Sequence, residues 1–504
     1  MSDLSRWLRI ATCVLALAAC GQGSVDVDRP RSGSVSLRGT ASAPLAYAGG
    51  GIWSATVTLP AGRVNVGLLV DGVAEGAAAG LAPPGLAPPL SAAADPAAPL
   101  AQLELPLSGP FEVRFDERRG RLTLDFGARF RDGLPEVARA LVDALEKPDD
   151  AHVGALRAAA SAAELPIVRG GDVLFVDLER ADESVAGTWN GWSASADPMV
   201  PLGEGALAYL GRPLGPGLRG AYKLVHAGVW RKDPRDFEIE WDGFDPGAPG
   251  DFNSVLYTDG WVQTGSRLRW LPEVASSALF ADGPRDVYVY LPAGYDERPD
   301  RRYPSLYVQD GNESIVRSQF HQVADQVIAA GQAAPLILVF VALPTQQTRT
   351  DEYTFASAGA RGDAYVRFLA DELRPHIDAS FRTLDRPDAR GVAGASLGGL
   401  IALYAAWQRD DMWRRACAQS ASLFWSNDAM IGLMQAGPAE PLRIYLDSGC
   451  PNDNCDVTRR LSDLLAAQSY DLRHVEAPGA QHDWADWRAR FGGALAFLFP
   501  PSEY

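Results

Sequence analysis

Alternating hydrophobic and polar residues mark residues 32–130 as a β-rich region. Near its start, "SVSLRGT" and "GIWSATVTLPAGRVNVGLLVDG" alternate with a period of two between turns that contain Gly and Pro. "PFEVRFDE" and "GRLTLDFGARF" repeat the pattern near its end. The stretch between them is rich in Ala, Pro and Gly, a composition that resists packing, so we expect a linker there.

The period changes in residues 131–168. "LPEVARALVDALEK" and "AHVGALRAAASAAE" place apolar residues three and four positions apart, which is the spacing of one helix face. We therefore expect a helical connector between two β modules. Alternation returns in residues 169–262, in "DVLFVDLE", "ESVAGTWNGWS" and "GAYKLVHAGVWRKDP", and predicts the second β module.

In residues 263–504, short apolar strands alternate with helices. The strand candidates are "RDVYVYLPAGY", "YPSLYVQDG", "LILVFVALP", "ARGVAGAS", "RACAQSAS", "RIYLDSG" and "DLRHVEA". Helical patterns such as "GDAYVRFLADELRPHIDASF", "LGGLIALYAAWQRDD" and "VTRRLSDLLAAQ" lie between them. This order predicts an α/β domain with a mostly parallel sheet covered by helices on both faces. Ligands of such sheets bind at the carboxyl ends of the strands.

Length and charge narrow the classes of function. A chain of 504 residues with 47% hydrophobic residues is long enough for several domains. Its formal net charge of -17 repels phosphate backbones, so we expect no nucleic-acid partner. The 6 His are scattered singly rather than spaced as metal ligands, and we expect neither a metal nor another cofactor.

The first residues have the pattern of an export signal. Arg6 and Arg9 precede a short apolar run, which indicates a signal peptide over residues 1–19. The end of the run, "LAAC", resembles the bacterial lipobox, which implies a lipid anchor on Cys20 followed by a tether over residues 20–31. Gly21 after the Cys favours the outer membrane, facing the periplasm. An ordinary secretory signal with an incidental Cys is the alternative.

Export would place the cysteines in an oxidising compartment. Disulfides persist in oxidising compartments, and Cys450 and Cys455 lie close together in one predicted loop. We expect a local disulfide between them. Cys417 is left over, and we expect it to be a buried free thiol.

The second β module carries a specific set of motifs, "GTWNGWS", "YKLV", "GVW" and "FNSV". In this order they resemble the early-set immunoglobulin-like module of glycogen branching enzymes and of the AMP-activated kinase β subunit. The resemblance implies an all-β immunoglobulin-like fold and a glucan-contacting surface made by Trp192, Lys223, Trp230 and Asn253. The alternative is a module that only packs as a lid, with its Trp residues in the core.

"GVAGASLGG" places Ser396 in a G-x-S-x-G motif. The chain has 50 Gly, so the motif alone carries little weight. Its context is stronger, because an apolar strand precedes the serine and a helix follows at once, which predicts a tight strand-turn-helix elbow. Glycines fit such a turn because Cβ atoms there would collide with the neighbouring strand and helix. We therefore predict that Ser396 is a nucleophile.

A serine needs a base, and hydrolases of this fold run Ser, acid, His along the chain. His482 lies in a loop after the last predicted strand and is our candidate base, whereas His474 lies within that strand. The acid should follow "RIYLDSG". We favour Asp453 in the Cys loop, with Asp456 as the alternative acid; Asp447 lies at the strand end, and Asp456 is also placed to cap the next helix.

The C-terminal region as a whole resembles the enterochelin esterase and esterase D group of α/β-hydrolases. "VYVYLPAGYDERPDRRYPSLYVQDG", "RTDEYT", "GASLGG", "QSASLFW" and "QHDWADW" occur in that order in the group. The resemblance implies an α/β-hydrolase fold with an oxyanion hole formed by the N–H groups of Leu397 and Gly311. It also implies a substrate pocket; the residues at the matching positions are Arg349, Glu352, Tyr353 and Trp425. Feruloyl and acetyl-xylan esterases share this core.

These patterns together predict a serine esterase similar to enterochelin esterases, which hydrolyses carboxylic esters through an acyl-enzyme. One alternative is a carbohydrate esterase that removes feruloyl or acetyl groups from glycans. The other is a carbohydrate-binding lipoprotein whose hydrolase domain is inactive. The complete set of Ser396, Asp453 and His482 argues against that last reading.

Overall fold

The computed structural model describes residues 15–16, 34–39, 41–49, 51–70, 73–75, 101–105, 109–116, 121–126, 134–146, 149–202, 207–243, 252–274, 284–343 and 346–504. Most of the predicted signal peptide, Cys20, the tether and most of the Ala/Pro linker lie outside these residues. The chain divides into two compact units. The first unit comprises Met1–Asp236 and Ser254–Val262, and the second comprises Phe237–Asn253 and Gln263–Tyr504. The sequence pattern had assigned residues 237–253 to the β module upstream.

The start of the first unit consists of antiparallel strands, as the alternation predicted. Its strands are β1 (Leu15–Ala16), β2 (Val35–Gly39), β3 (Ala43–Pro44), β4 (Ala46–Gly49), β5 (Ile52–Leu59), β6 (Gly62–Val70), β7 (Val73–Glu75), β8 (Ala101–Leu105), β9 (Gly109–Asp116) and β10 (Arg121–Phe126). One sheet has the order β1-β10-β9-β5-β4, and a second has the order β3-β2-β6-β7, with β8 paired to β6. Alternate residues of β9, namely Phe111, Val113 and Phe115, point into the core.

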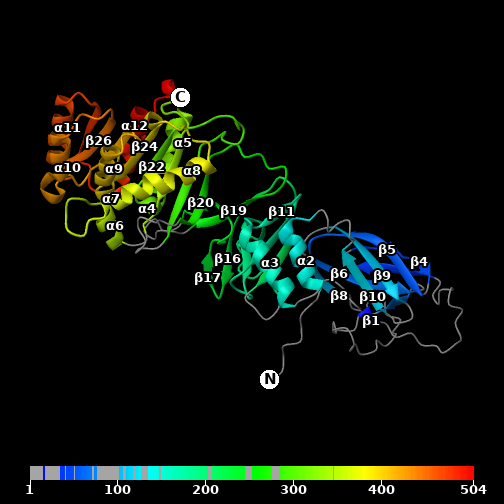
Figure 1. Cartoon of the computed structure of the whole chain (residues 1–504). Coiled ribbons are helices and arrows are strands. Elements are labelled where there is room, and N and C mark those ends of the chain that lie inside the picture. Colours follow the sequence, from blue (N-terminus) through cyan, green and yellow to red (C-terminus); the bar gives the residue numbers. More distant parts are fainter. Residues whose placement is uncertain are drawn as a thin grey trace, which may run out of the picture. The chain divides into compact units, whose positions relative to one another are not determined.

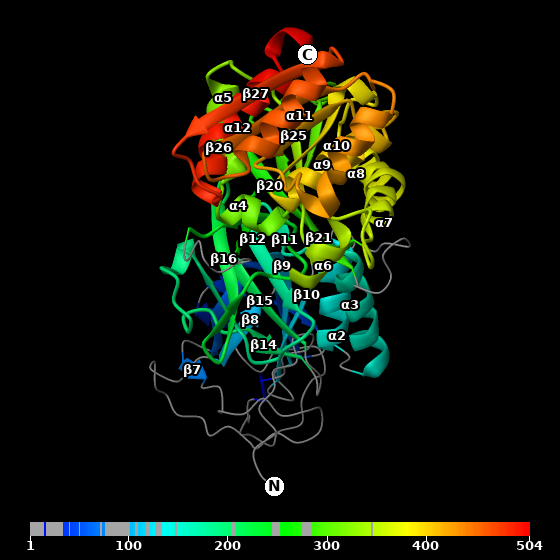
Figure 2. The same ribbon diagram turned by 90° about the vertical axis from the view of Figure 1, so that its left-hand side faces the viewer.

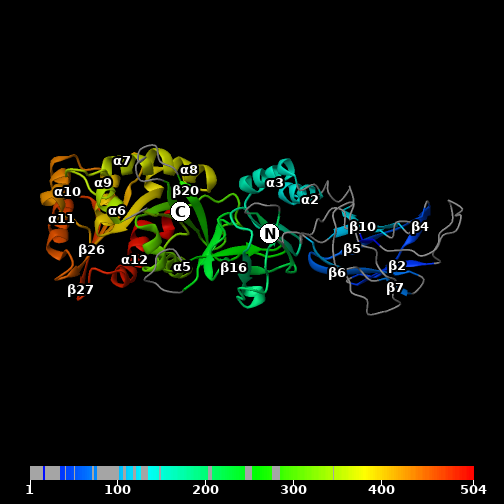
Figure 3. The same cartoon turned by 90° about the horizontal axis from the view of Figure 1, so that it is seen from below.

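The predicted helical pair is α2 (Glu136–Glu146) and α3 (Asp150–Ala162), which lie side by side (Figures 1 and 3). Asp149 caps α3 by accepting a hydrogen bond of 3.0 Å from the N–H of His152. Leu141 of α2 and Leu156 of α3 are fully buried in the same core as β5 and β9. The helices are therefore part of the core of the first unit as well as a connection.

The remainder of the first unit is a two-sheet arrangement of antiparallel strands. One sheet has the order β11-β12-β15-β14, formed by Ile167–Arg169, Asp172–Asp177, Ala208–Pro213 and Val200–Pro201. The facing strands are β13 (Ser184–Gly187), β16 (Arg219–His226), β17 (Val229–Arg231) and β19 (Phe252–Tyr257). Phe175 of β12, Leu210 of β15 and Tyr222 of β16 share a core between the two layers.

The second unit is an α/β domain with a mostly parallel sheet, as the strand and helix alternation predicted, and has the α/β-hydrolase fold that the family resemblance implied (Figures 1 and 2). The strand order is β18-β20-β21-β23-β22-β24-β25-β26-β27. The bounds are β18 (Glu238–Trp241), β20 (Arg267–Val274), β21 (Arg285–Leu291), β22 (Ser305–Val308), β23 (Ile337–Val341), β24 (Arg390–Ala395), β25 (Arg415–Gln419), β26 (Arg443–Cys450) and β27 (Asp471–Pro478). Strands β22 to β27 pair in parallel, whereas β20 and β21 pair antiparallel with their neighbours. Strands β22 to β26 are buried on both faces because helices cover both, whereas β27 at the edge of the sheet is partly exposed.

Alternate residues of these strands enter two different cores. Val392, Ala416 and Ile444 pack on one face, whereas Ala393, Cys417 and Tyr445 pack on the other. The first face is covered by helical segments from α7 (Gly362–Arg367) through α8 (Arg374–Ser380), α9 (Leu397–Gln408), α10 (Trp425–Ala436) and α11 (Cys455–Ala467). The second is covered by α4 (Gly311–Val316), α5 (Phe320–Ala329) and α12 (Trp484–Leu498). The short helix α6 (Gln346–Glu352) precedes α7, and a π-helical segment, Phe368–Leu373, joins α7 to α8. Cys417 is buried and free, as expected.

Candidate active site

Ser396 occupies a sharp turn between β24, which ends at Ala395, and α9, which begins at Leu397. Its backbone has φ 60° and ψ -124°, a conformation that L-residues rarely adopt. Three backbone hydrogen bonds hold it there: the N–H of Ser396 donates to Gln419 (3.0 Å), and its carbonyl accepts from Leu400 (3.1 Å) and Ser422 (3.0 Å). The turn is therefore fixed to the end of β25 as well as to its own helix.

The flanking glycines are required by close backbone approach. A Cβ on Gly394 would lie 2.4 Å from the carbonyl carbon of Gly398, so the two glycines touch across the turn. A Cβ on Gly398 would lie 2.9 Å from an oxygen of Asp310. The motif thus encodes a steric requirement, as the sequence argument proposed for this elbow.

The predicted oxyanion donors both begin helices at one edge of the sheet. Leu397 is the first residue of α9 and Gly311 is the first residue of α4. These helices follow β24 and β22, which are adjacent and parallel, so both N-termini lie at the carboxyl edge. The neighbouring N–H of Asp310 is already used, because it donates to the hydroxyl of Tyr353 (2.9 Å).

His482 and Asp453 form a close pair. Nδ1 of His482 lies 2.5 Å from Oδ1 of Asp453, and Asp453 is buried whereas the imidazole is 40% exposed. Burial raises the pKa of Asp453, but hydrogen bonds from His482, Ser420 and the backbone of Gly449 outweigh it and lower the pKa below its usual range. The acid therefore remains ionised, and its contact with Nδ1 directs Nε2 of the ring away from it.

The other aspartates considered from the sequence lie elsewhere. The side chain of Asp456 is 93% exposed and pairs with Arg459 at 3.1 Å. Asp447 is buried, accepts a hydrogen bond from Gln419 (2.9 Å) and lies 3.1 Å from Nε of Arg490. Burial raises the pKa of Asp447 to about 6 against the opposing effect of Arg490. Of these three carboxylates, that of Asp453 contacts the candidate base.

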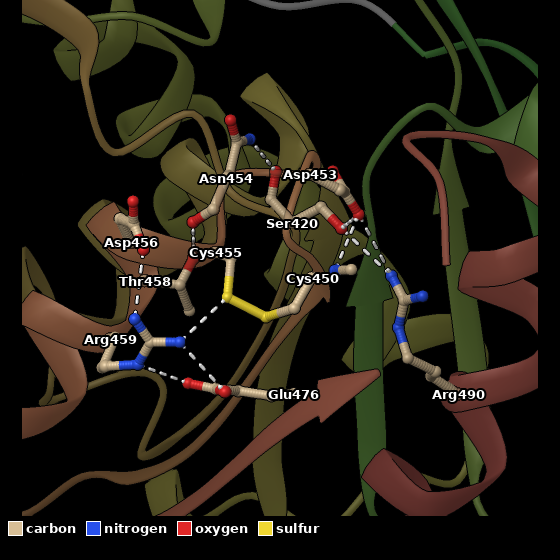
Figure 4. The surroundings of a disulfide bond; sticks show 11 residues. Ser420, Cys450, Asp453, Asn454, Cys455, Asp456, Thr458, Arg459, Glu476 and Arg490 are labelled. Carbon is tan, nitrogen blue, oxygen red and sulfur yellow. Dashed lines mark hydrogen bonds and ion pairs between the residues drawn. A yellow bond between two sulfur atoms is a disulfide. The ribbon is translucent and has the colours of Figure 1, made fainter. Parts of the chain in front are cut away.

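The acid loop, which we define as residues 449–455, is closed by a disulfide between Cys450 and Cys455 (Figure 4). Arg459 packs on the disulfide, donating to Sγ of Cys455 (3.2 Å) and forming two hydrogen bonds with Glu476. A Cβ on Gly449 would lie 2.1 Å from the carbonyl oxygen of Ala480, so the acid loop and the segment before His482 approach without a side chain between them.

The topology brings the candidate nucleophile, acid and base to one edge of the sheet. Ser396 follows β24, the acid loop follows β26 and His482 follows β27, and these strands are parallel. Carboxyl ends of parallel strands share one edge, where α/β proteins hold their ligands. Ser422, in the turn after β25, also reaches this edge, with its Oγ 3.4 Å from Oγ of Ser396.

Residues 276–498 match the protein family described as "Putative esterase". The C-terminal half of the chain is thus similar to this esterase family. The bifunctional endo-1,4-beta-xylanase/feruloyl esterase of Xylanibacter ruminicola is 28% identical to it over 217 residues, which cover 40% of this chain and 27% of that protein. The iron(III) enterobactin esterase of Dickeya dadantii is 27% identical over 225 residues, which cover 41% of this chain and 50% of that protein. The chain thus spans half or less of these two relatives. A crystal structure of the enterobactin esterase from Shigella flexneri covers 68% of this chain and 98% of its own at 18% identity, with a TM-score of 0.40.

Two residues predicted to line the substrate pocket of the esterase region do not do so. Glu352 and Tyr353 are fully buried. Glu352 pairs with the fully buried Arg285, and the hydroxyl of Tyr353 accepts from the backbone of Asp310. Tyr353 therefore supports the loop after β22 from within, whereas Glu352 pairs with β21. Neither can touch a substrate, because neither has exposed surface.

The other two predicted pocket residues are partly exposed. Arg349 forms a bidentate ion pair with Asp310, with Nε–Oδ1 at 2.7 Å and Nη2–Oδ2 at 2.9 Å. Trp425 begins α10, and its Nε1 lies 3.4 Å from the hydroxyl of Ser357. Phe424, directly before it, is 55% exposed and was not predicted from the sequence.

The predicted glucan surface of the first unit is only partly exposed. The rings of Trp192 and Trp230 lie 6.5 Å apart, and Trp230 is 41% exposed. Lys223 is buried, which corrects its expected role in contacting a sugar. Asn253 is also buried, belongs to the second unit and donates to Glu240 (3.2 Å), so the same correction applies to it.

Two further observations concern metals and membranes. Cys450, Cys455 and Glu476 are close enough to hold a metal ion, but the disulfide occupies both sulfurs and Arg459 holds the carboxylate. Among the residues that the structure describes, no helix combines the length and the apolar character needed to cross a bilayer.

Several residues around the acid escaped the sequence analysis. Ser420, Trp487 and Arg490 surround Asp453, yet they lie 33 residues before and 34 and 37 residues after it in the chain (453 − 420, 487 − 453 and 490 − 453). Only the position of Ser420 directly after a strand that ends at the carboxyl edge could have signalled it. The rival base, His474, lies within β27, and burial lowers its pKa.

Proposed function

We propose that this protein is a serine esterase in which Ser396, His482 and Asp453 form the catalytic triad. Nε2 of His482 takes the proton of the Ser396 hydroxyl as the oxygen attacks the ester carbonyl. Asp453 holds the ring through Nδ1 and stabilises the imidazolium that forms. The N–H groups of Leu397 and Gly311 stabilise the oxyanion, His482 returns the proton to the leaving alcohol, and water then releases the acid.

The contact of His482 with Asp453 at 2.5 Å, at the edge that also carries the Ser396 elbow, is the observation that carries this proposal. Exposed and surface His–Asp pairs are common, but this acid is buried and held by further hydrogen bonds to its second oxygen. An oriented base at the same edge of the sheet as a strained, partly exposed serine is the arrangement that acyl transfer uses.

The first test is hydrolysis of p-nitrophenyl acetate and p-nitrophenyl butyrate by the full chain. We expect turnover that Ser396→Ala reduces to the background rate while the melting temperature stays unchanged. A wild-type protein without activity, or a variant that keeps it, would refute the esterase proposal.

For the natural substrate we propose an ester that carries an aromatic acid or amide, of the catecholate siderophore type. Support comes from the relative named iron(III) enterobactin esterase and from exposed Phe424, three residues after the Ser420–Ala421 turn at the active-site edge. The feruloyl esterase relative supports the alternative, a feruloylated glycan. Comparison of kcat/KM for enterobactin, methyl ferulate and an acetylated xylo-oligosaccharide decides between them, and the siderophore proposal fails if either of the other two is preferred.

A carbohydrate contact at the Trp192–Trp230 pair is a second candidate function. Exposed indole faces stack on sugar rings, and here two rings lie 6.5 Å apart with Trp230 open to solvent. A glucan pull-down should retain the wild type and release Trp230→Ala. Equal retention of both would remove the candidate.

We also propose that the protein is exported and anchored to the cell envelope, in the outer membrane facing the periplasm, through a lipid on Cys20. The support is the "LAAC" sequence and a disulfide that suits an oxidising compartment. Palmitate labelling of the wild type and of Cys20→Ser tests this proposal. Label on both proteins, or on neither, would contradict it.

A further inference from the structure

The carboxylate of Asp453 is held by different groups at its two oxygens. Oδ1 faces Nδ1 of His482. Oδ2 accepts from the hydroxyl of Ser420 at 2.6 Å (Figure 4) and from the N–H of Gly449 at 3.0 Å. The backbone bond belongs to the acid loop itself, whereas the hydroxyl comes from the turn after β25. The orientation of the acid thus depends on a residue outside its own loop.

The hydrogen-bonding capacity of the Ser420 hydroxyl is fully used. Its oxygen accepts from Nε1 of Trp487 at 3.0 Å and from Nη2 of Arg490 at 3.0 Å. A hydroxyl has one proton and two acceptor lone pairs. With both lone pairs occupied by donors that cannot act as acceptors, the proton must point at Asp453. The two donors from α12 therefore fix the direction of the hydrogen bond that reaches the acid.

The backbone of Ser420 is fixed as well. Its φ is 42°, in the left-handed region, and its N–H donates to the carbonyl of Asp447 (2.8 Å). Its own carbonyl accepts from the side-chain amide of Asn454 (2.8 Å), which lies next to Asp453. Because Ser420 is fully buried, neither water nor a rotamer change offers its hydroxyl another partner.

Arg490 connects this hydroxyl to both buried carboxylates. Its Nε lies 3.1 Å from Oδ1 of Asp447, and its Nη2, which donates to Ser420, lies 3.7 Å from Oδ2 of Asp453. The guanidinium is itself buried. Asp447 therefore holds the guanidinium of Arg490 in place, and the hydroxyl of Ser420 links this positive charge to Asp453 by hydrogen bonds.

We propose that Ser420 is a positioning residue for the catalytic acid, and that Trp487 and Arg490 act on Asp453 through its hydroxyl. This inference rests on the proposed triad. Losing a hydrogen bond to the charged carboxylate would let Asp453 rotate away from Nδ1, so the imidazolium would be less well stabilised when the proton moves. Substrate binding would be unaffected, because none of the three residues needs to touch the ester.

The test is a double-mutant cycle between Ser420→Ala and Asp453→Asn, measured as kcat and KM for p-nitrophenyl butyrate. We expect Ser420→Ala alone to lower kcat about 10- to 100-fold with KM changed less than about twofold. In the Asp453→Asn background the same change should lower kcat less than about twofold, because the group it positions is gone. Ser448→Ala is the matched control: Ser448 is a fully buried serine of β26 whose hydroxyl has no hydrogen-bond partner among the described residues.

The outcomes separate the inference from the triad. If Asp453→Asn keeps full activity, the triad itself is wrong. If Asp453→Asn is impaired but Ser420→Ala has no effect, or has the same effect in both backgrounds, the triad stands and the positioning role is refuted. Should Ser420→Ala fail to fold, Trp487→Phe removes one donor and keeps a ring against His482; we expect it to lower kcat about 2- to 10-fold, and unchanged kcat would contradict the proposal.

Discussion

The serine elbow and the acid loop lie at the same edge of one sheet but are held in place by different means. The elbow is held by its backbone: Gly394 touches Gly398, and Ser396 makes three backbone hydrogen bonds, to its own helix and to the end of β25. The acid loop is held by side chains and a covalent bond, namely the Cys450–Cys455 disulfide and the hydroxyl of Ser420. A site that is held by its backbone can be recognised from a short sequence motif. A site that is held by side chains depends on residues from distant parts of the sequence.

The largest effect should come from the acid itself. Asp453→Asn keeps the shape but loses the charge that stabilises the imidazolium, so we expect kcat to fall about 10³- to 10⁴-fold. Asp456→Asn is the matched control, since that side chain is exposed and pairs with Arg459, and its kcat should stay within about twofold. Steady-state kinetics on one ester measures both. Equal losses of kcat in the two variants, or a loss in Asp456→Asn alone, would show that Asp453 is not the catalytic acid.

The elbow should respond to the smallest possible side chain. In Gly394→Ala the new Cβ would lie 2.4 Å from Gly398, so strand and helix must separate, and we expect a kcat loss of about 10²-fold or more with a stability loss of about 3 kcal/mol. Gly432→Ala in α10 has no atom within 4 Å and should raise stability by up to about 1 kcal/mol. Urea unfolding compares the two variants. A stable, active Gly394→Ala would show that the elbow is not sterically fixed.

The disulfide should matter less than either. Replacing Cys450 and Cys455 by Ser removes a short covalent loop, and loop-closure entropy gives a stability loss of about 2 kcal/mol. We expect kcat to fall less than about tenfold, because Ser420 and Gly449 still hold the acid. Reductant should lower the wild-type melting temperature and leave the double variant unchanged. If reductant also lowered the melting temperature of the double variant, the effect of the reductant would come from a site other than this disulfide.

The smallest effect concerns pH and the second buried carboxylate. The folded-state pKa of Asp447 is about 6, above its usual value near 3.8, so the folded state binds a proton that the unfolded state releases between these values. Its stabilising contribution is complete below about pH 4 and is lost as the pH rises through 6, a change of about 1–3 kcal/mol. Asp447→Asn should lack this pH dependence in urea unfolding measured from pH 4 to 7. Parallel curves for the two proteins would contradict this assignment. Asp453 has the opposite shift, so its stabilising contribution is present at neutral pH and lost only at lower pH.

The sequence was sufficient for strands β21 to β27 of the second unit and for the elbow, whereas β18 and β20 were not predicted. Apolar runs such as "LILVFVALP" are typical of buried parallel strands. The glycines around Ser396 contact each other although they are only four residues apart, so their role can be read from a short motif. Asp453 and His482 followed from chain order, because parallel strands place their ends together. The helices α4, α5 and α10 were not predicted; α4 has only 6 residues, too few for a periodic pattern.

The sequence did not predict correctly which side chains are exposed. Glu352 was expected in a pocket, but its partner Arg285 comes from β21, a strand distant in sequence. Lys223 lies in β16 on a strand that pairs on both sides, which buries it beside Ala186. The support of the acid by Ser420, Trp487 and Arg490 likewise depends on contacts between β25, the acid loop and α12. Such contacts are set by tertiary packing and leave no local pattern.

Covalent capture of the nucleophile tests the central claim most directly. We expect a fluorophosphonate probe to add once to the wild-type protein, with peptide mass spectrometry placing the adduct on Ser396. The adduct should be absent in Ser396→Ala, and its formation should slow at least about 10³-fold in His482→Ala. An adduct on another residue, or labelling that does not depend on His482, would contradict the account.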